Sequence, residues 1–242
     1  MKIAILMSTY NGEEYLSKQV ESIKNQTNND WHLYIRDDGS TDSTFSILKE
    51  ISDKDKRITF VNKDDVKNVG VIRSFMSLLE STDADFYMFS DQDDVWKENK
   101  IQRALSLMKH QDYQSTPICL HTELQIVDDN LQPVELMKRG RVWSDFQHFL
   151  FGNCVTGCTV MINQKLKQMI NFDSVDYSRI AMHDWLFADI NENIDMSGDC
   201  KGLNQNNICE ECMFDAQHDY CCKLECGEHE FCRGCQNAGE QE

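Results

Sequence analysis

The stretch IAILMSTYNG, residues 3–12, starts as an uninterrupted apolar run and ends in a polar turn. The apolar run predicts a buried β-strand over residues 3–7. Beyond the turn, apolar side chains recur with the period of a helix, at Tyr15, Leu16, Val20 and Ile23. The first unit of the chain is therefore predicted to be a strand, a polar turn and a helix, in that order.

The same order of elements recurs along the chain. A strand-like run at residues 31–35 ends in DDGSTD at residues 37–42, and a helical pattern follows through residues 45–51. A third run, FYMF at residues 86–89, leads into SDQDD at residues 90–94. Alternating strands and helices predict an α/β fold, with a mostly parallel sheet flanked by helices. Such folds bind ligands at the carboxyl ends of their strands, so the three polar turns are expected to share one edge of the sheet.

The third turn carries two carboxylates, Asp91 and Asp93, spaced two residues apart. Held at a strand end, such a pair can chelate a hard divalent cation and leave coordination positions open for phosphate oxygens. The alternative interpretation is an acidic turn that caps a helix starting near Trp96. Motifs elsewhere in the chain favour the cation site.

Six motifs occur in a fixed order: MSTYNGEEYL (7–16), IRDDGSTD (35–42), NVGVIRSF (68–75), FSDQDDVW (89–96), TGCTVMIN (156–163) and MHDW (182–185). Together they resemble the family 2 glycosyltransferases with the GT-A fold, and within them the rhamnosyltransferase-like branch. The resemblance covers residues 1–188. It implies a Rossmann-like sheet and the inverting transfer of a sugar, with rhamnose as one candidate. The donor would be a nucleoside-diphosphate sugar and the acceptor a saccharide hydroxyl.

The resemblance assigns the donor nucleotide to the first three motifs. Tyr10 would stack on a pyrimidine ring, while Ser8 or the backbone beside it hydrogen-bonds the base. The alternative for this turn is that Asn11 caps the following helix and Tyr10 packs against the protein. Asp38 would accept the N3 proton of uracil or thymine, which selects the base because leaving that interaction unmade is costly. Arg73 would face the nucleotide from the start of the third helix, where free backbone N–H groups suit an anion.

The remaining motifs supply the reaction chemistry. Asp91 would contact the ribose or a metal-bound water, and Asp93 would bind the cation, Mg²⁺ or Mn²⁺, that neutralises the departing diphosphate. In the H-D-W motif, the resemblance makes Asp184 the general base that takes the proton of the acceptor hydroxyl. Asp184 could also cap the helix that follows, and His183 could orient it or be structural. The turn at residues 156–159 would line the acceptor side or simply lead into a strand.

Two further expectations concern buried side chains. Trp96 is predicted to be a packing residue and not a platform for a sugar. Cys119, Cys154 and Cys158 have no ligand-like partner near them in the sequence, so they are predicted to be buried thiols.

Composition and charge exclude several classes of function. The chain has 242 residues, 40% of them hydrophobic, which is enough for one full α/β core. Its formal net charge of −17 argues against nucleic-acid binding, because phosphate contacts need a basic patch. The N-terminal apolar run is too short for a signal sequence or a membrane span, and no Lys/Arg-rich amphipathic segment suggests membrane attachment. A cytoplasmic location is therefore expected.

Residues 191–242 differ from the rest of the chain. They hold 12 acidic against 3 basic residues, and 8 of the 11 cysteines. Apolar periodicity fades over residues 191–207, which predicts a linker between a transferase domain at 1–190 and a Cys-rich tail at 208–242. In the resembling transferases the H-D-W motif is followed by more helix, strand and loop. The first domain is therefore expected to lack its C-terminal part.

The tail has the spacing of zinc ligands, and a disulfide framework is disfavoured in a reducing cytoplasm. It resembles the front part of a RING finger. That resemblance implies one complete tetrahedral zinc site, with two further ligands that would open a partial second site. The complete site comprises Cys209, Cys212, Cys232 and Cys235, and the partial site comprises Cys226 and His229. The alternative is a disordered tail that binds metal only adventitiously.

Two classes of function remain. The first is a metal-dependent inverting glycosyltransferase with a structural zinc tail. The second is a catalytically decayed or chimeric transferase domain that acts as a zinc-dependent interaction protein, with a protein partner bound through the tail.

Overall fold

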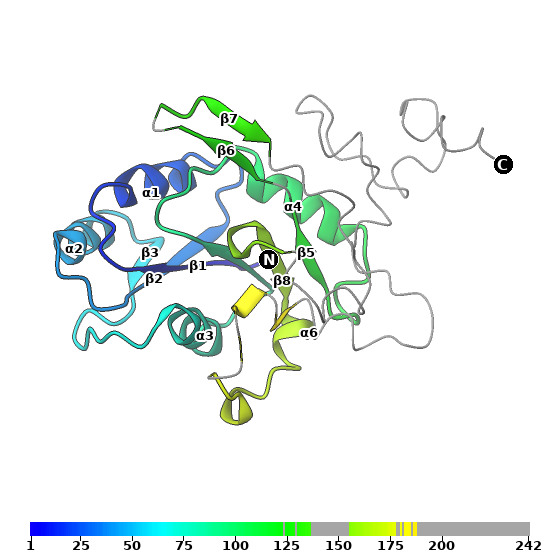
Figure 1. The fold of residues 1–242 in the computed structure, drawn as a ribbon. Coiled ribbons are helices and arrows are strands. Elements are labelled where there is room, and N and C mark those ends of the chain that lie inside the picture. Colours follow the sequence, from blue (N-terminus) through cyan, green and yellow to red (C-terminus); the bar gives the residue numbers. More distant parts are fainter. Residues whose placement is uncertain are drawn as a thin grey trace.

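The computed structural model describes residues 1–122, 124–128, 130–136, 155–177, 180, 182–184 and 186–187 (Figure 1). The strands are β1 (Ile3–Thr9), β2 (Trp31–Asp37), β3 (Ile58–Phe60), β4 (Phe86–Ser90), β5 (Cys119–His121), β6 (Gln125–Val127), β7 (Pro133–Leu136) and β8 (Val160–Asn163). The α-helices are α1 (Leu16–Lys24), α2 (Thr44–Lys54), α3 (Val71–Ser81), α4 (Lys100–Lys109) and α6 (Gln164–Lys167). Two short 3-10 segments are η1 (Gly157–Thr159) and η2 (Phe172–Ser174). Strands and helices thus alternate through the first half of the chain, as the sequence predicts.

Six strands form one sheet in the order β3-β2-β1-β4-β8-β5. β1 pairs in parallel with β2 and with β4, and β2 pairs in parallel with β3. β8 runs antiparallel to both of its neighbours, β4 and β5. The mostly parallel sheet confirms the predicted α/β fold. β6 and β7 pair separately as an antiparallel two-stranded ribbon.

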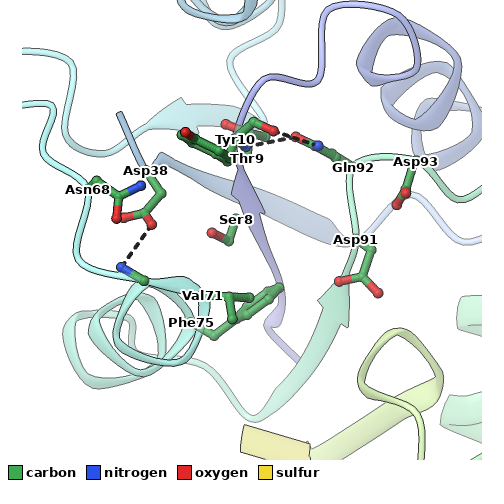
Figure 2. A pocket seen from close by; sticks show the side chains of 11 residues that line it. Ser8, Thr9, Tyr10, Asp38, Asn68, Val71, Phe75, Asp91, Gln92 and Asp93 are labelled. Carbon is green, nitrogen blue, oxygen red and sulfur yellow. Dashed lines mark hydrogen bonds between the residues drawn. The ribbon is translucent and has the colours of Figure 1, made fainter. Parts of the chain in front are cut away.

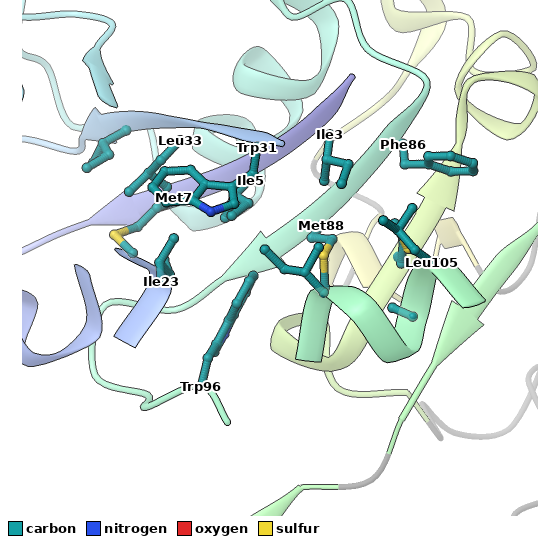
Figure 3. Packing of buried hydrophobic residues seen from close by; sticks show 14 of the residues in the cluster. Ile3, Ile5, Met7, Ile23, Trp31, Leu33, Phe86, Met88, Trp96 and Leu105 are labelled. Carbon is teal, nitrogen blue, oxygen red and sulfur yellow. The ribbon is translucent and has the colours of Figure 1, made fainter. Parts of the chain in front are cut away.

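Apolar side chains of β1 alternate between two cores, one on each face of the sheet. Ile3, Ile5 and Met7 pack on the face covered by α1, α2 and α4 (Figure 3). Ala4 and Leu6 belong to the core on the opposite face, which α3 and α6 cover (Figure 1). A strand buried on both faces reads as a continuous apolar run, which explains why this segment shows no alternation. Each fully buried Ile or Leu contributes roughly 1.5–3 kcal/mol relative to the exposed side chain.

Trp96 belongs to the first of these cores and is 5% exposed, which confirms its predicted packing role. α4 begins at Lys100, with Asn99 as its N-cap. The acidic run at residues 90–94 therefore ends well before the helix. The alternative in which this run caps a helix near Trp96 is wrong.

The strand order creates a crevice between β1 and β4. β2 and β3 extend the sheet on one side of β1, and β4 lies on the other side. The pairing of β1 with β4 ends at Met7 and Ser90, although β1 continues to pair with β2 as far as Thr9. This reversal of strand order is the place where open α/β sheets bind ligands, at the carboxyl ends of the strands.

No helix among the described residues is long and apolar enough to cross a membrane. The predicted linker and the Cys-rich tail, with all six candidate zinc ligands, lie outside the described residues, as does Cys154.

Candidate functional site

A cavity of about 500 Å³ opens at the carboxyl ends of β1, β2 and β4 (Figure 2). It is lined by Ser8, Thr9, Tyr10, Asp38, Asn68, Gly70, Val71, Phe75, Asp91, Gln92 and Asp93. Residues from four segments far apart in the sequence thus meet in one place: the three polar turns and the segment that leads into α3. The predicted donor-site residues among them are Ser8, Tyr10, Asp38, Asp91 and Asp93. Arg73 and Asp184 are not among the lining residues.

The first turn presents Tyr10 to the cavity with its side chain half-exposed. Asn11 has a left-handed backbone (φ 49°), and its Oδ1 accepts a hydrogen bond from the Thr41 amide at 2.8 Å. Tyr15 is the N-cap of α1. The alternative in which Asn11 caps this helix is therefore wrong, because its side chain joins the first turn to the second.

Asp38 is buried at one end of the cavity, and the protein itself compensates its charge. Its Oδ1 accepts hydrogen bonds from Arg36 Nη1 at 2.6 Å and from the Val69 amide at 2.8 Å. Its Oδ2 accepts one from the Gly70 amide at 2.9 Å. A carboxylate oxygen can accept two hydrogen bonds, so Oδ2 keeps one acceptor position for a ligand. We call this part of the cavity the Asp38 end.

Arg36 is a member of this site that sequence reasoning missed. It is 9% exposed and also donates to the Lys67 carbonyl at 2.9 Å and to the Ser74 hydroxyl at 3.2 Å. A buried charge must be paired to be tolerated, and Asp38 provides that pairing. The available signal was an arginine placed at the end of a strand predicted to be buried, directly before two aspartates.

Two amides just before α3, those of Val69 and Gly70, are taken by the Asp38 carboxylate. Gly70, at φ 84°, is the N-cap of this helix, and its amide is taken by Asp38. Arg73 lies in the first turn, where its guanidinium carbon is 5.0 Å from the centre of the Tyr177 ring. The structure therefore places Arg73 against Tyr177 and not in the cavity.

Three carboxylates follow β4 at the opposite end of the cavity, which we call the acidic end: Asp91, Asp93 and Asp94. Asp91 and Asp93 line the cavity, across from Asp38 (Figure 2). Burial, together with the charges of Asp94, Asp93 and Asp184, raises the pKa of Asp91 to about 6. Negative charge is thus only partly compensated here, and a cation would relieve the repulsion.

Cys158, in η1, also reaches the acidic end. One ligand atom from each of Asp91, Asp94 and Cys158 lies within 4.8 Å of the other two. Cys158 is buried as predicted, but the expectation that it has no ligand-like partner is wrong. Lys100 Nζ donates to the Cys158 carbonyl at 2.8 Å and lies 4.7 Å from the centre of the Trp96 ring. Its positive charge counters part of the rise in the pKa of Asp94 that burial causes.

The donor chemistry of the acidic end fits a hard divalent cation. Aspartate oxygens are ligands that Mg²⁺ and Mn²⁺ prefer, and a cation needs them ionised. Asp91 and Asp93 present such oxygens to the cavity. Asp94 lies close to Cys158, and the positive charge of Lys100 partly compensates the Asp94 carboxylate.

Asp184 is 3% exposed and lies in a short helical segment that includes His183. Its Oδ2 is 3.5 Å from the position that a Cβ on Gly157 would occupy, and its charge contributes to the raised pKa of Asp91. The carboxylate therefore lies near the acidic end. Because His183 already belongs to the helical segment, Asp184 is inside it, and the alternative of an N-cap is wrong.

His183 packs among aromatic rings. Its ring stacks on Phe75 with the centroids 4.3 Å apart, and it also contacts Phe89 and Phe187. Burial lowers the pKa of His183 to about 3, so the ring is neutral near pH 7. Neither ring nitrogen has a hydrogen-bond partner within the part of the chain that the structure describes. This geometry favours the structural interpretation of His183.

Comparison with known proteins identifies the family of this chain. Residues 4–168 match the family described as Glycosyl transferase family 2. The dTDP-rhamnosyl transferase RfbG of Shigella flexneri is 29% identical over 189 residues, which cover 74% of this chain and 62% of RfbG. WfgD of Escherichia coli, a UDP-Glc:alpha-D-GlcNAc-diphosphoundecaprenol beta-1,3-glucosyltransferase, is 26% identical over 174 residues, which cover 72% of this chain and 64% of WfgD. The chain thus spans less than two thirds of the length of either relative.

Solved structures show the same fold. S. aureus TarS 1-349 matches with a TM-score of 0.56 and 18% identity, covering 78% of this chain and 54% of that one. It has also been solved with UDP and with UDP-GlcNAc. The mannosyltransferase PcManGT from Pyrobaculum calidifontis, in complex with GDP-Man and Mn²⁺, matches with a TM-score of 0.50 and 15% identity, covering 69% and 45%. Since the family match spans more than half of the chain, and the fold agrees with it, this chain belongs to glycosyl transferase family 2.

Proposed function

We propose that the chain is a metal-dependent inverting glycosyltransferase that moves a sugar from a nucleoside-diphosphate donor to the hydroxyl of a saccharide acceptor. The observation that carries this proposal is the cavity, which has an aromatic ring and a held carboxylate at one end and only partly compensated carboxylates at the other. Its volume of about 500 Å³ suits a small-molecule ligand. The two ends suit a base and a diphosphate, respectively.

At the Asp38 end, the Tyr10 ring would stack on a pyrimidine and Ser8 would lie beside the base. Asp38 would accept the N3 proton of uracil or thymine at Oδ2, its one remaining acceptor position. Arg36 and two backbone amides already hold the Asp38 carboxylate in place. Binding of the nucleotide would therefore cost little entropy for ordering this side chain. The UDP complex of TarS 1-349 supports a pyrimidine nucleotide, whereas the PcManGT complex holds GDP-Man, so neighbours of this fold differ in their base. Arg73 would join the nucleotide only after leaving Tyr177.

At the acidic end, Asp91 and Asp93 would hold Mg²⁺ or Mn²⁺, with Asp91 also near the ribose. The cation, when bound, neutralises charge on the diphosphate as it leaves. The presence of Mn²⁺ in the PcManGT complex supports this choice. Asp94, Cys158 and Lys100 would stay paired with one another and set the charge that surrounds Asp91.

Asp184 would act as the general base. While the acceptor oxygen bonds to the anomeric carbon, the Asp184 carboxylate takes the hydroxyl proton and the bond from that carbon to the diphosphate oxygen breaks. Attack opposite the leaving diphosphate inverts the anomeric centre. The electrostatic contact between Asp184 and Asp91 supports this role, because the reacting carbon is joined to the diphosphate.

The donor we favour is dTDP-rhamnose, because RfbG is named as a dTDP-rhamnosyl transferase. WfgD is named for UDP-Glc, so relatives of this chain differ in their donors. The test incubates the purified chain, Mn²⁺ and a saccharide acceptor with dTDP-rhamnose, UDP-glucose or UDP-GlcNAc, and measures released nucleoside diphosphate. We expect release from dTDP-rhamnose that stops with EDTA. Release from none of the donors contradicts the proposed transfer, and release from another donor alone contradicts the choice of rhamnose.

The proposal extends to the segments outside the described residues. The transferase domain would end near residue 190, and the tail at 208–242 would fold around one zinc in a cytoplasmic protein. The support is the spacing of the cysteines in the sequence. Zinc binding would need Cys209, Cys212, Cys232 and Cys235, with Cys226 and His229 as a partial second site. No observation on the described residues favours the alternative of a decayed interaction protein.

A further inference from the structure

Gln92 occupies the middle position of the D-x-D motif, where the motif itself asks for no particular residue. Backbone pairing between β1 and β4 stops at Met7 and Ser90, and the crevice opens beyond that point. The Gln92 side chain crosses this opening. Its Oε1 accepts a hydrogen bond from the Tyr10 amide at 2.9 Å, and its Nε2 donates to the Tyr10 carbonyl at 2.9 Å (Figure 2).

This pair of hydrogen bonds satisfies both backbone groups of one residue. A side-chain amide has the same donor and acceptor as a peptide group, so Gln92 continues the strand pairing after the backbone of β4 has turned away. Tyr10 is thereby held through its main chain, while its ring remains half-exposed in the cavity. The ring can then contact a ligand without giving up either hydrogen bond.

Gly12 leaves the space that Gln92 fills. A Cβ added at Gly12 would lie 2.2 Å from Gln92 Oε1 and 2.5 Å from its Cδ, far closer than atoms can approach. The three nearest atoms to that position all belong to the Gln92 side chain. A methyl group at residue 12 would therefore push the amide away from Tyr10 and meet no other part of the protein as closely.

We infer that Gln92 is a positioning residue that joins the two ends of the donor site. It is bonded to Tyr10, which the proposed function places on the base, and it lies between Asp91 and Asp93, which would hold the cation on the diphosphate. Base and diphosphate are joined through the ribose in one molecule of limited reach, so the distance between their two sites matters for affinity. The inference rests on the proposed function, because it takes the ligand to be a nucleoside diphosphate.

The expected effect follows from the two hydrogen bonds. Losing both, in a site that stays folded, should weaken nucleotide binding about tenfold. Both polar atoms of the Gln92 amide are hydrogen-bonded to Tyr10, and an amide is not a base near neutral pH. Its loss should therefore raise the KM for the donor while kcat at saturating donor stays within a few fold of the parent value. A residue that only stabilised the fold would lower the melting temperature and leave the affinity of the folded molecules unchanged.

The test is a double-mutant cycle on the full chain. Gln92→Ala, Gly12→Ala and the double variant are titrated with UDP and dTDP in the presence of Mn²⁺, and melting temperatures report folding. Lys97→Ala, an exposed change in the same loop, is the matched control. Each single variant should weaken binding about tenfold. The double variant should bind as Gln92→Ala does, because without the glutamine nothing remains for the methyl group to displace.

Three results overturn the inference. Parent-like affinity in Gln92→Ala would show that the link is not needed, and effects of the two changes that multiply in the double variant would show that they act separately. A lower kcat with an unchanged KM would place the residue in the reaction and not in donor positioning. In each of these cases the parent still binds nucleotide. A parent that binds neither UDP nor dTDP would remove the proposed function together with this inference.

Discussion

The two ends of the cavity treat a buried aspartate in opposite ways. Asp38 is neutralised within the protein by Arg36 and two backbone amides. Asp91 lies among the charges of Asp94, Asp93 and Asp184, and its pKa is raised to about 6. The first end is complete before any ligand arrives. The second end has an excess of negative charge, which a bound cation would balance.

Under the proposed function, this difference would separate recognition of the base from the chemistry at the diphosphate. A carboxylate held by three donors presents a fixed acceptor to a base and gains little from further positive charge. A carboxylate surrounded by other carboxylates gains most from a cation, and the diphosphate then follows the cation. The same residue type can therefore select a base at one end and prepare for a leaving group at the other. The same Asp→Asn substitution should therefore change the stability of the metal-free fold in opposite directions at the two ends.

The largest effect should come from Asp184→Asn. The amide keeps the shape of the side chain and loses the basic oxygen, so transfer should fall by about 10² to 10⁴ while nucleotide affinity changes only a few fold. Initial rates with saturating donor, together with calorimetric titration of UDP or dTDP, measure the two quantities. A variant that keeps most of the parental rate would show that another group is the base.

Neutralising Asp38 should destabilise the fold. Asp38→Asn leaves the buried Arg36 without its counter-charge. The new side-chain NH2 group would also face the amide of either Val69 or Gly70, which is itself a hydrogen-bond donor. Breaking a buried ion pair by removing one partner costs about 3–5 kcal/mol. Urea unfolding at pH 7 without metal measures the loss. An unchanged free energy of unfolding would mean that the charge of Asp38 is not compensated in the way the structure indicates.

The same change at Asp91 should have the opposite sign. Asp91→Asn removes a charge that burial and neighbouring carboxylates disfavour, so the melting temperature at pH 7 without metal should rise. Nucleotide binding in the presence of Mn²⁺ should weaken, because a cation ligand is gone. A fall in melting temperature like that of Asp38→Asn would contradict the claim that the two aspartates differ in how their charge is compensated.

The smallest effect should be a dependence on pH that belongs to the acidic end. The folded pKa of Asp91, about 6, lies above the unfolded value of about 3.9, so the folded state binds this proton more tightly. The contribution of Asp91 to stability without metal should therefore rise as the pH falls from 7 through 6 and level off below about 4. Over the same interval the cation must compete with the proton, so Mn²⁺-dependent binding should weaken by up to about tenfold per pH unit.

The control for the pH dependence is Asp91→Asn, which has no proton to lose at this position. In the parent, protonation of Asp91 should add to the melting temperature as the pH falls from 7 to 5. The variant should show no such contribution. Identical pH profiles for the parent and the variant would show that Asp91 titrates near its ordinary value.

Local sequence patterns predicted the frame of the site. Continuous apolar runs predicted β1, β2 and β4, and helical periodicity predicted α1 and α2, because both patterns reflect burial of neighbouring residues. Parallel strands then bring their terminal turns together, which is why Tyr10, Asp38 and Asp91 were expected at one edge and are found there. The antiparallel insertion of β8 between β4 and β5 depends on pairing between distant segments, which no local pattern reports.

The contacts that distinguish the two ends were beyond the sequence for the same reason. Cys158 lies near Asp91 because the fold places η1 beside the loop after β4. The spacing of these residues along the chain does not predict this contact. Gln92 was not singled out from the sequence, because its partner, Tyr10, belongs to another turn. Arg36 was not singled out from the sequence either, because its pairing with Asp38 depends on how the chain turns at the end of β2.

The most direct test compares nucleotide binding with and without the cation. Purified protein is titrated with UDP and dTDP in Mn²⁺ and again in EDTA, and melting temperatures are recorded in parallel. We predict binding in Mn²⁺, with a stabilisation of about 2.7 kcal/mol at 100 times the dissociation constant. In EDTA the affinity should fall sharply, because the acidic end then repels the diphosphate. Equal affinity in the two conditions, or no binding in either, would contradict the account. In that account the protein itself compensates the charge of Asp38, whereas a cation must compensate the charge of Asp91 before the diphosphate binds.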